Sequence, residues 1–160
     1  MINKFDGKYA FLSNFATSPL VYEGIAYPTV EHAFQAAKVL DMTQRFEIAN
    51  LPTPGAAKRA GRSVKLREDW EEVKEQVMED CLRAKFSDPS LREQLLATCD
   101  QFLVEGTTWH DQYWGICTCD KCGGNGRNRL GYLLMKIREE IRDEAFSALF
   151  PEIGSEKSSC

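Results

Sequence analysis

Residues 28–38 constrain the fold more than any other segment, because a helical reading divides them into an apolar side and a polar stripe. Successive side chains of a helix are about 100° apart, so Glu31, Gln35 and Lys38 stack at spacings of i, i+4 and i+7. The stripe borders the apolar side and does not oppose it. A carboxylate, an amide and an amine can therefore line a pocket at the edge of the core. The apolar side consists of Val30, Ala33, Phe34, Ala37 and Leu40.

The same stripe has a simpler interpretation as an ordinary solvated helix face. Glu followed by Lys two turns later is common on the surface of soluble proteins, where charged side chains face water. Helical spacing alone leaves both interpretations open. The choice between a pocket wall and a solvated face depends on the rest of the chain.

Length and composition favour one globular domain over residues 1–150, followed by a flexible tail over residues 151–160. No apolar run approaches the roughly 18 residues of a membrane span, and the amino terminus lacks the apolar core of a signal peptide. We therefore expect a cytoplasmic protein with no membrane contact. The net charge of −4 argues against nucleic acid as a default partner. A local basic pocket can still bind one or two phosphates.

Periodicity and capping signals predict a mostly helical domain with a few short β-strands near its N-terminus. Two short strands are expected within residues 21–27, around a Glu-Gly turn. Thr29 is the expected N-cap of the first helix, while Thr53 and Asp88, each followed by proline, cap later ones. A short strand or extended piece is expected at residues 101–105. The helices expected after the first cover about residues 43–51, 54–61, 70–86, 89–98 and 130–141.

Three of the six cysteines fall within six residues, at Cys117, Cys119 and Cys122. In a reducing compartment such a cluster indicates metal before disulfide, and a structural zinc site needs four ligands. Only Cys119 and Cys122 have the usual Cys-x₂-Cys spacing. The ligand count is thus incomplete, and we expect no cofactor, with structural zinc as the alternative. The other residues that could complete such a site are His110, Cys99 and Cys81.

The loop before the last expected helix combines aromatic, acidic and glycine residues. Residues 109–115 contain Trp109, Trp114, a tyrosine, a histidine and a carboxylate, and three glycines follow within residues 123–126. This composition suits a nucleobase beside a phosphate or a ribose. Burial of either tryptophan in the core is the alternative. Residues 62–67 form a basic connector that can bind phosphate or can simply balance nearby acids.

Several separate blocks, in the same order along the chain, resemble the NADAR, or YbiA-like, family. The match extends from about residue 9 to residue 145. The resemblance implies a mostly helical fold and an N-glycosidase that cleaves a bond between ribose C1′ and nitrogen. It implies two substrate classes: phosphorylated ribosylamino-pyrimidine intermediates of riboflavin synthesis, and ADP-ribose attached to guanine. The blocks are residues 11–15, 27–38, 61–62, 85–86, 111–115 and 126–131.

The residues of these blocks suit that chemistry, in which positive charge develops at C1′ and negative charge on the leaving nitrogen. Glu31 is the expected acid or base, and Asp111 is expected to hold ribose hydroxyls or stabilise the cation. Lys38 is expected either to attack C1′, giving a ring-opened Schiff base, or to bind phosphate. Similar proteins are thought to use a lysine covalently, and Lys65 and Lys85 are the alternatives for that role.

The remaining expected site residues bind substrate. Asn14 and Gln35 can orient the ribose or the base, Trp114 can stack on the base, and Arg62 and Arg67 can neutralise phosphate. The full expected set is Asn14, Phe15, Gln35, Arg62, Arg67, Trp114, Gly115 and Asn128.

One segment departs from the family pattern. After residue 115 this chain has a longer loop with the three-cysteine cluster, where relatives commonly have a short run rich in glycine and acidic residues, so substrate choice can differ. The sequence favours hydrolysis of the ribosylamino-pyrimidine phosphates. Removal of ADP-ribose from guanine is the alternative reaction, and a non-catalytic ADP-ribose or nucleotide reader is the alternative class. The oligomeric state is left open.

Overall fold

The computed structural model describes residues 1–151. Apart from Pro151, the predicted C-terminal tail lies outside the described residues. The prediction of a mostly helical fold with a few short strands is confirmed. The elements in chain order are the 3₁₀ helix η1 (Gly7–Leu12), β1 (Leu20–Tyr22), β2 (Ile25–Tyr27), α1 (Val30–Ala36), α2 (Met42–Ala49), α3 (Pro54–Ser63), α4 (Trp70–Lys85), α5 (Pro89–Leu96), β3 (Gly106–Thr107), β4 (Ile116–Cys117) and α6 (Arg129–Leu149).

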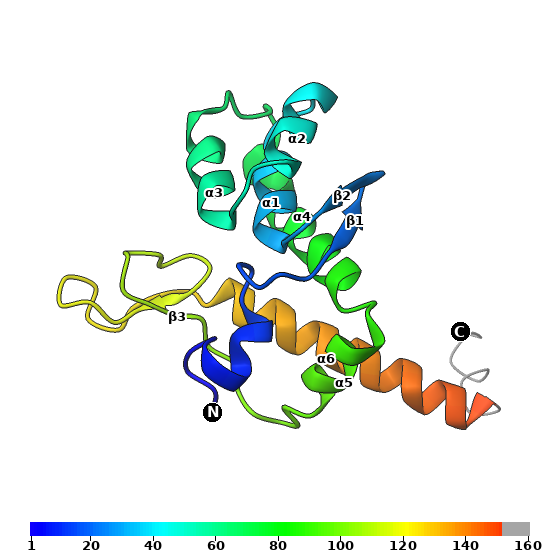
Figure 1. Cartoon of the computed structure of the whole chain (residues 1–160). Helices are drawn as coiled ribbons and strands as arrows, with labels where there is room; N and C mark the ends of the chain where they lie inside the picture. The colour runs from blue at the N-terminus through cyan, green and yellow to red at the C-terminus, as the bar shows by residue number, and fades with distance from the viewer. Residues whose placement is uncertain (152–160) are drawn as a thin grey trace.

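Helix α1 is the centre of the packing, and every residue in it is buried. It lies among α2, α3 and α4 (Figure 1). Thr29 caps it as predicted, accepting a hydrogen bond of 3.1 Å from the His32 backbone N–H. The His32 ring donates from Nε2 to the Leu51 carbonyl at 3.0 Å, so its Nδ1 accepts from the Thr29 hydroxyl at 2.7 Å. A polar network thus fixes the start of a helix that has no solvated face.

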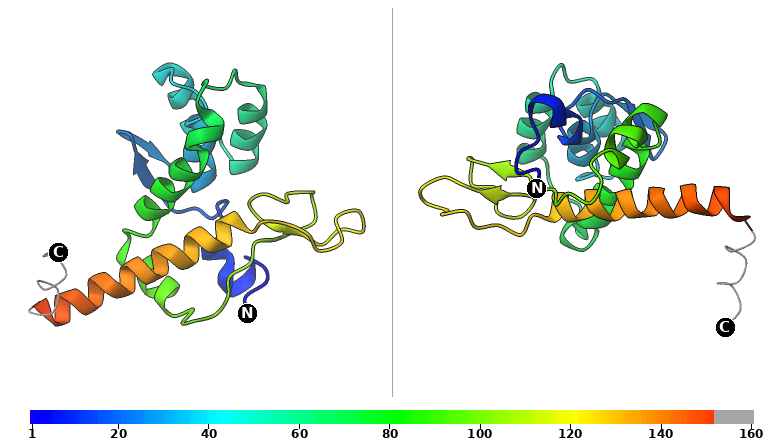
Figure 2. Two further views of the ribbon diagram at one scale, coloured as in Figure 1. Left: turned by 180° about the vertical axis from the view of Figure 1, so that it is seen from behind. Right: turned by 90° about the horizontal axis from the view of Figure 1, so that it is seen from below.

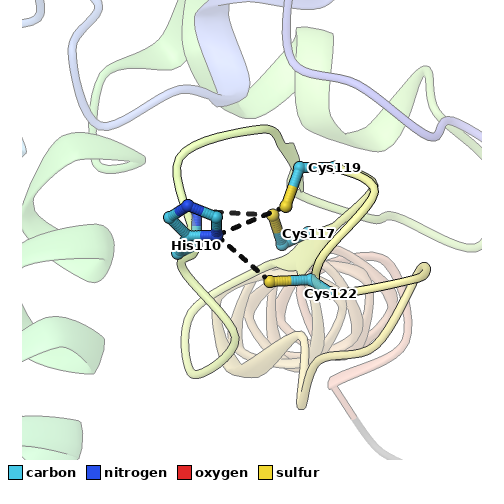
Figure 3. A group of neighbouring side chains, drawn as sticks. All are labelled: His110, Cys117, Cys119 and Cys122. Carbon is cyan, nitrogen blue, oxygen red and sulfur yellow. Dashed lines mark hydrogen bonds between the residues drawn. The ribbon is translucent and has the colours of Figure 1, made fainter.

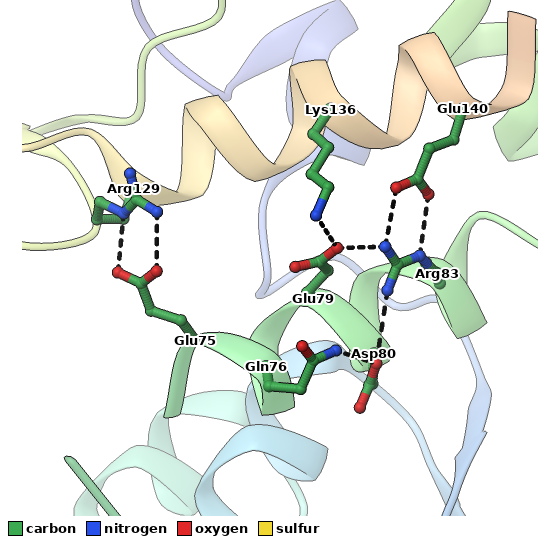
Figure 4. Close-up of polar contacts among 8 residues, drawn as sticks. All are labelled: Glu75, Gln76, Glu79, Asp80, Arg83, Arg129, Lys136 and Glu140. Carbon is green, nitrogen blue, oxygen red and sulfur yellow. Dashed lines mark hydrogen bonds and ion pairs between the residues drawn. The ribbon is translucent and has the colours of Figure 1, made fainter. Parts of the chain in front are cut away.

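Helices α4 and α6 cross and are joined by ion pairs along their contact (Figure 4). Arg129 binds Glu75 through two hydrogen bonds of 2.8 Å, and Lys136 donates to Glu79 at 2.6 Å. A planar guanidinium paired through two bonds to a carboxylate is the geometrically most specific ion pair. The first turn of α6 is therefore held on α4. Figure 2 shows the segment between β3 and α6 extending to one side of the helices, beyond this end of α6.

Two details of the helix predictions were wrong, namely the ends of the first and third helices. The first helix ends at Ala36, and the backbone bonds just beyond it are of the i→i+3 type, so Lys38 follows the helix; Leu40 is 65% exposed. The second helix begins at Met42, in agreement with the predicted start near residue 43, and the Asp41 carboxylate caps it by accepting from the Gln44 N–H at 2.8 Å. Gly61 does not end the third helix, which continues to Ser63.

The two N-terminal strands form the expected antiparallel pair, with Glu23 and Gly24 at the turn in positive-φ conformations. Residues 101–105 form no strand and contribute one isolated parallel bridge, between Ile2 and Leu103. Two backbone hydrogen bonds of 2.8 Å flank that bridge. They hold the N-terminus beside the segment that leads into the loop of residues 105–126.

Candidate active site

A cavity of about 370 Å³ opens between the segment that follows η1, helices α1 and α3, and the loop that precedes α6. Small-molecule sites commonly measure about 300 to 1,000 Å³, so this volume suits a nucleotide-sized ligand. The cavity combines cationic, acidic and aromatic side chains. Its lining residues are Ser13, Asn14, Phe15, Glu31, Phe34, Gln35, Lys38, Lys58, Arg62, Met78, Glu105, Trp109, Asp111, Trp114 and Leu130.

Glu31 lies in the first turn of α1 and is only 7% exposed. Gln35 Nε2 donates to its Oε1 at 2.8 Å, and its backbone N–H donates to the Asn14 carbonyl at 3.1 Å. Burial raises the pKa of Glu31, because this loss of hydration outweighs the opposing influence of the Gln35 hydrogen bond and of Lys58 and Lys38. A carboxyl group with a raised pKa keeps its proton to higher pH than usual, which suits a general acid.

Gln35 is packed between Glu31 and α3. Its side-chain oxygen lies directly against Gly61, where an added Cβ would overlap it. That oxygen has no hydrogen-bond partner within residues 1–151. The absence of a side chain at Gly61 thus permits α1 and α3 to approach closely enough to hold Gln35 against the Glu31 carboxylate.

Lys38 lies half-buried just after α1, with its Nζ 5.9 Å from the Phe34 ring centre and 6.0 Å from that of Trp70. Burial lowers the pKa of Lys38, and the nearby cations Arg62 and Lys58 act in the same direction against the opposing charge of Glu31. A lowered pKa increases the fraction of neutral amine, which is the nucleophilic form.

Asp111 and Trp114 line the cavity from one turn of the loop that precedes α6. Asp111 Oδ1 accepts from the backbone N–H groups of Tyr113 at 3.1 Å and Trp114 at 2.9 Å. The Trp114 ring packs edge-on against Phe34, with ring centres 5.4 Å apart, and the Tyr113 hydroxyl donates to Glu75 of α4 at 2.6 Å. The loop that carries Asp111 is thereby fixed to both α1 and α4.

Asn14 is buried and offers a polar atom without a protein partner. Its Nδ2 lies 3.5 Å from the Met78 sulfur, while its Oδ1 has no partner among the residues described. An unsatisfied buried carbonyl oxygen costs free energy, which a hydroxyl or N–H group of a ligand can recover. Lys85 supports this segment, since its buried Nζ donates to the Ser13 carbonyl at 2.9 Å.

The structure brings most of the predicted site residues to the cavity but not all of them. Arg67 pairs with Asp69 through bonds of 2.6 and 2.9 Å, and only its backbone N–H reaches the site region, donating to the Lys38 carbonyl at 2.8 Å. Asn128 is buried, joining the backbones of Leu103 and Glu105. Those at the cavity are Glu31, Lys38, Asp111, Asn14, Phe15, Gln35, Arg62 and Trp114.

Gly115 and the later glycines lie in the loop that precedes α6 and do not line the cavity. A Cβ at Gly115 would overlap the Glu105 carbonyl, and a Cβ at Gly126 would overlap the Gly115 carbonyl. Of the alternative lysines, neither Lys65 nor Lys85 lines the cavity. Gly115 and Gly126 thus permit a close approach between backbone segments of the same loop.

Three cavity residues were missed by the sequence reasoning or left without a role. Lys58 projects from α3 with its Nζ 5.8 Å from the Phe15 ring centre and 5.6 Å from that of Trp109. Trp109 is 56% exposed, so it is not a core residue. Burial raises the pKa of Glu105 to about 7, with a further contribution from the charge of Asp111. Lys58 and Glu105 lie outside the recognised blocks, and no local pattern separates them from ordinary surface charges.

The three-cysteine cluster lies within the loop of residues 105–126 that precedes α6. His110, Cys117, Cys119 and Cys122 converge, with their potential ligand atoms within 4.8 Å of one another (Figure 3). The structure thus selects His110, and not Cys81 or Cys99, as the fourth member. The group is a set of residues that can bind a metal.

The fold and this cavity define a protein of the NADAR family, to which the chain belongs: residues 2–142 match the model of the NADAR domain. The chain is 50% identical over 139 residues to the N-glycosidase YbiA of Escherichia coli, covering 85% of this chain and 84% of the relative. It is 37% identical to an N-glycosidase of Nostoc punctiforme, over 84% of this chain and 87% of that protein. The prediction of a hydrolase acting on N-glycosyl bonds is confirmed.

Two further comparisons extend this result. The NMR structure of Escherichia coli YbiA matches with a TM-score of 0.76 at 45% identity, covering 91% of this chain and 89% of that one. A riboflavin biosynthesis protein of Vibrio vulnificus is 34% identical over 95% of this chain, which spans 41% of that longer protein. Within residues 1–151, no helix has the length and apolar character needed to cross a membrane.

Proposed function

We propose that this chain hydrolyses the ribosyl C1′–N bond of phosphorylated ribosylamino-pyrimidine intermediates of riboflavin synthesis. The observation that carries the proposal is a buried carboxyl group, Glu31, sharing one cavity with the cations Lys38, Lys58 and Arg62. The names of the relatives support it, because they include N-glycosidases and a riboflavin biosynthesis protein.

The distribution of charge orients such a substrate. Lys58 and Arg62 come from α3, whereas Glu105, Asp111 and Trp114 come from the loop before α6. A phosphate binds on the α3 side, where the cations are, and the base stacks on the tryptophan side. The C1′ atom then lies between them, next to Glu31 and Lys38. Asn14, with its unpartnered carbonyl oxygen, accepts from a ribose hydroxyl or from the base.

In the proposed reaction the C1′–N bond breaks, the nitrogen gains a proton and C1′ gains the hydroxyl group of water. Glu31, whose raised pKa favours the protonated form, donates a proton to the departing nitrogen. Asp111 stabilises positive charge at C1′ or binds the ribose hydroxyls. The products are ribose 5-phosphate and the free aminopyrimidine. Side chains supply every group, so the reaction uses no cofactor.

Lys38 provides a covalent variant of this route. Its neutral amine attacks C1′ as the nitrogen leaves, forming a ring-opened Schiff base that water then hydrolyses. The variant has the same overall balance of atoms. It differs in passing through a bond between Lys38 Nζ and C1′.

Removal of ADP-ribose from guanine is the second candidate, favoured by the exposed Trp109. This ring lies at the cavity with Lys58 above it, which provides an additional stacking surface for a second base. The net charge of −4 disfavours long contacts with a nucleic-acid duplex but not with one modified nucleotide. We place either reaction in the cytoplasm, where the free thiols of the described cysteines remain reduced.

The test is to incubate the protein separately with the ribosylamino-pyrimidine phosphate and with ADP-ribosylated guanosine, and to measure release of free base by chromatography. Faster release from the pyrimidine, at matched subsaturating concentrations, is the expected result. Faster release from the guanosine substrate would assign the second candidate. Saturable binding with no release of either base would identify a non-catalytic reader and overturn both reactions.

A further inference from the structure

The cluster of His110, Cys117, Cys119 and Cys122 lies outside the cavity and takes no part in the proposed reaction. Cys117 belongs to β4, and Cys119 and Cys122 lie in the turn that follows it. His110 comes from the other side, in the connection between β3 and β4. The four side chains thus tie the two arms of one loop together (Figure 3).

The spacing of the potential ligand atoms matches that around a tetrahedral zinc ion. Bonds of about 2.3 Å to sulfur and 2.0 to 2.1 Å to nitrogen place the nitrogen about 3.6 Å from each sulfur and the sulfurs about 3.8 Å apart. In the structure His110 Nδ1 lies 3.3 Å from the sulfurs of both Cys119 and Cys122, and all four ligand atoms lie within 4.8 Å of one another. Small side-chain movements, outward for the short pairs and inward for the widest pair, accommodate the ion.

The surrounding backbone is arranged for thiolates. The His110 N–H donates to the Cys117 sulfur at 3.3 Å, and such amide donors stabilise the charge of a metal-bound thiolate. The N–H groups of Cys122 and Gly123 both donate to the Cys119 carbonyl, at 3.0 and 2.9 Å, which closes a tight turn between two of the ligands. Gly123 and Gly124 have positive φ angles there. The loop therefore presents three sulfurs to one point.

Backbone hydrogen bonds hold the end of this loop, but few of its side chains are buried. Residues 118–126 are mostly exposed, and Cys117 and Cys122 are its buried members. Sheet pairing in the loop is limited to the two-residue strands β3 and β4 and one bridge from Cys117 to Asn125. Three thiols cannot all pair as intramolecular disulfides. A metal ion can satisfy all three together with the imidazole.

We propose that this cluster binds one zinc ion as a structural site. Four protein ligands close the coordination sphere and leave no open position for water or substrate, as expected for structural and not catalytic zinc. The ion joins the arms of the loop and fixes His110, whose neighbours Trp109 and Asp111 both line the cavity. Zinc therefore orders one wall of the cavity without contacting the ligand. The site exists whether or not the proposed reaction is correct.

The first test is elemental analysis of protein purified under reducing conditions after growth with added zinc. We expect about one zinc per chain in the wild-type protein. The Cys119→Ser variant is expected to retain little zinc, whereas the control Cys99→Ser, which changes an exposed cysteine outside the cluster, should match the wild type. Zinc below about a tenth of an equivalent in the wild type, or full zinc in the Cys119→Ser variant, would overturn the assignment.

A second test avoids variants that fail to fold. The wild-type protein is stripped with a chelator and titrated with Co²⁺, and tetrahedral thiolate coordination is expected to give strong visible absorption and a sulfur-to-cobalt charge-transfer band, both removed by zinc. Amide hydrogen exchange should be faster in the metal-free protein over residues 106–126 and unchanged over α4. Absence of the cobalt bands, or identical exchange over that loop with and without zinc, would contradict the proposal.

Discussion

The side-chain amide of Gln35 donates a hydrogen bond of 2.8 Å to the carboxylate of Glu31, one turn earlier in the buried helix α1. The bond fixes the orientation of a carboxyl group whose pKa burial raises. Gln35 is itself held against Gly61 of α3. The position of the proposed acid thus depends on contacts between two helices.

Replacing Glu31 with Gln is expected to lower turnover by roughly two to four orders of magnitude, because the amide cannot donate a proton to the leaving nitrogen as the carboxyl group does. The substitution preserves shape and the contact with Gln35, so thermal unfolding should change little. Steady-state kinetics on the pyrimidine substrate and a melting curve test both statements. Unchanged turnover would remove Glu31 from the mechanism.

Borohydride added during turnover is expected to trap a covalent adduct on Lys38, since reduction converts a Schiff base into a stable amine. Mass spectrometry of the intact protein and of its peptides detects and locates the adduct. It should disappear in Lys38→Met and persist in the control Lys58→Met, because Lys58 is assigned to phosphate binding. A trapped adduct in the Lys38→Met protein would identify another lysine as the nucleophile.

Arg62 and Arg67 provide a matched test of phosphate binding. Arg62→Ala is expected to raise KM for the phosphorylated substrate about tenfold, the order of one charge-assisted hydrogen bond. Arg67→Ala should leave KM unchanged, because that side chain pairs with Asp69 and does not line the cavity. With the dephosphorylated substrate, the wild type and both variants should have similar KM values, because the group that Arg62 binds is then missing. An equal rise in KM for both variants would refute the assignment.

Gly61→Ala introduces a methyl group that overlaps the Gln35 amide. We expect a loss of about 1 to 3 kcal/mol of unfolding free energy, as for other overpacked sites, and reduced turnover as Gln35 moves from Glu31. Gly55→Ala in the same helix is the control: its Cβ would meet no atom closer than 3.6 Å. Urea unfolding and kinetics compare the two. Equal stability of both variants would show that the contact tolerates a side chain.

Glu105 gives a pH dependence of stability. Its pKa in the folded protein is about 7, against 4.5 as the ordinary value, so the folded state binds more protons between these pH values. The contribution of Glu105 to the free energy of unfolding is therefore fully present below pH 4.5 and is lost as the pH rises through 7. Glu105→Gln should therefore be more stable than the wild type at pH 8, by about 1 to 3 kcal/mol, but not at pH 5. Urea unfolding at both pH values measures this difference. The same difference in unfolding free energy between the two proteins at pH 5 and at pH 8 would contradict the prediction.

Local signals predicted the helix starts correctly where the cap is a short-range contact. Thr29, Thr53 and Asp88 each accept from a backbone N–H three residues later, so residue type and spacing suffice. The same reasoning failed beyond Ala36, where the helix ends and Leu40 turns to solvent. Beyond this end, the carbonyls of Lys38 and Val39 accept hydrogen bonds from Arg67 and Arg45, and helical spacing does not encode such partners.

The sequence by itself determined the helical class and the family, and it identified Glu31, Lys38 and Asp111 as candidate catalytic groups, because residue order and type carry that information. Only the tertiary structure decided which distant residues join them. It brought Lys58 and Glu105 to the cavity, left Arg67 beside Asp69, and placed His110 among three cysteines. The physical reason is that burial, pKa and ligand geometry depend on neighbours that the folded chain, and not the local sequence, brings within a few ångströms.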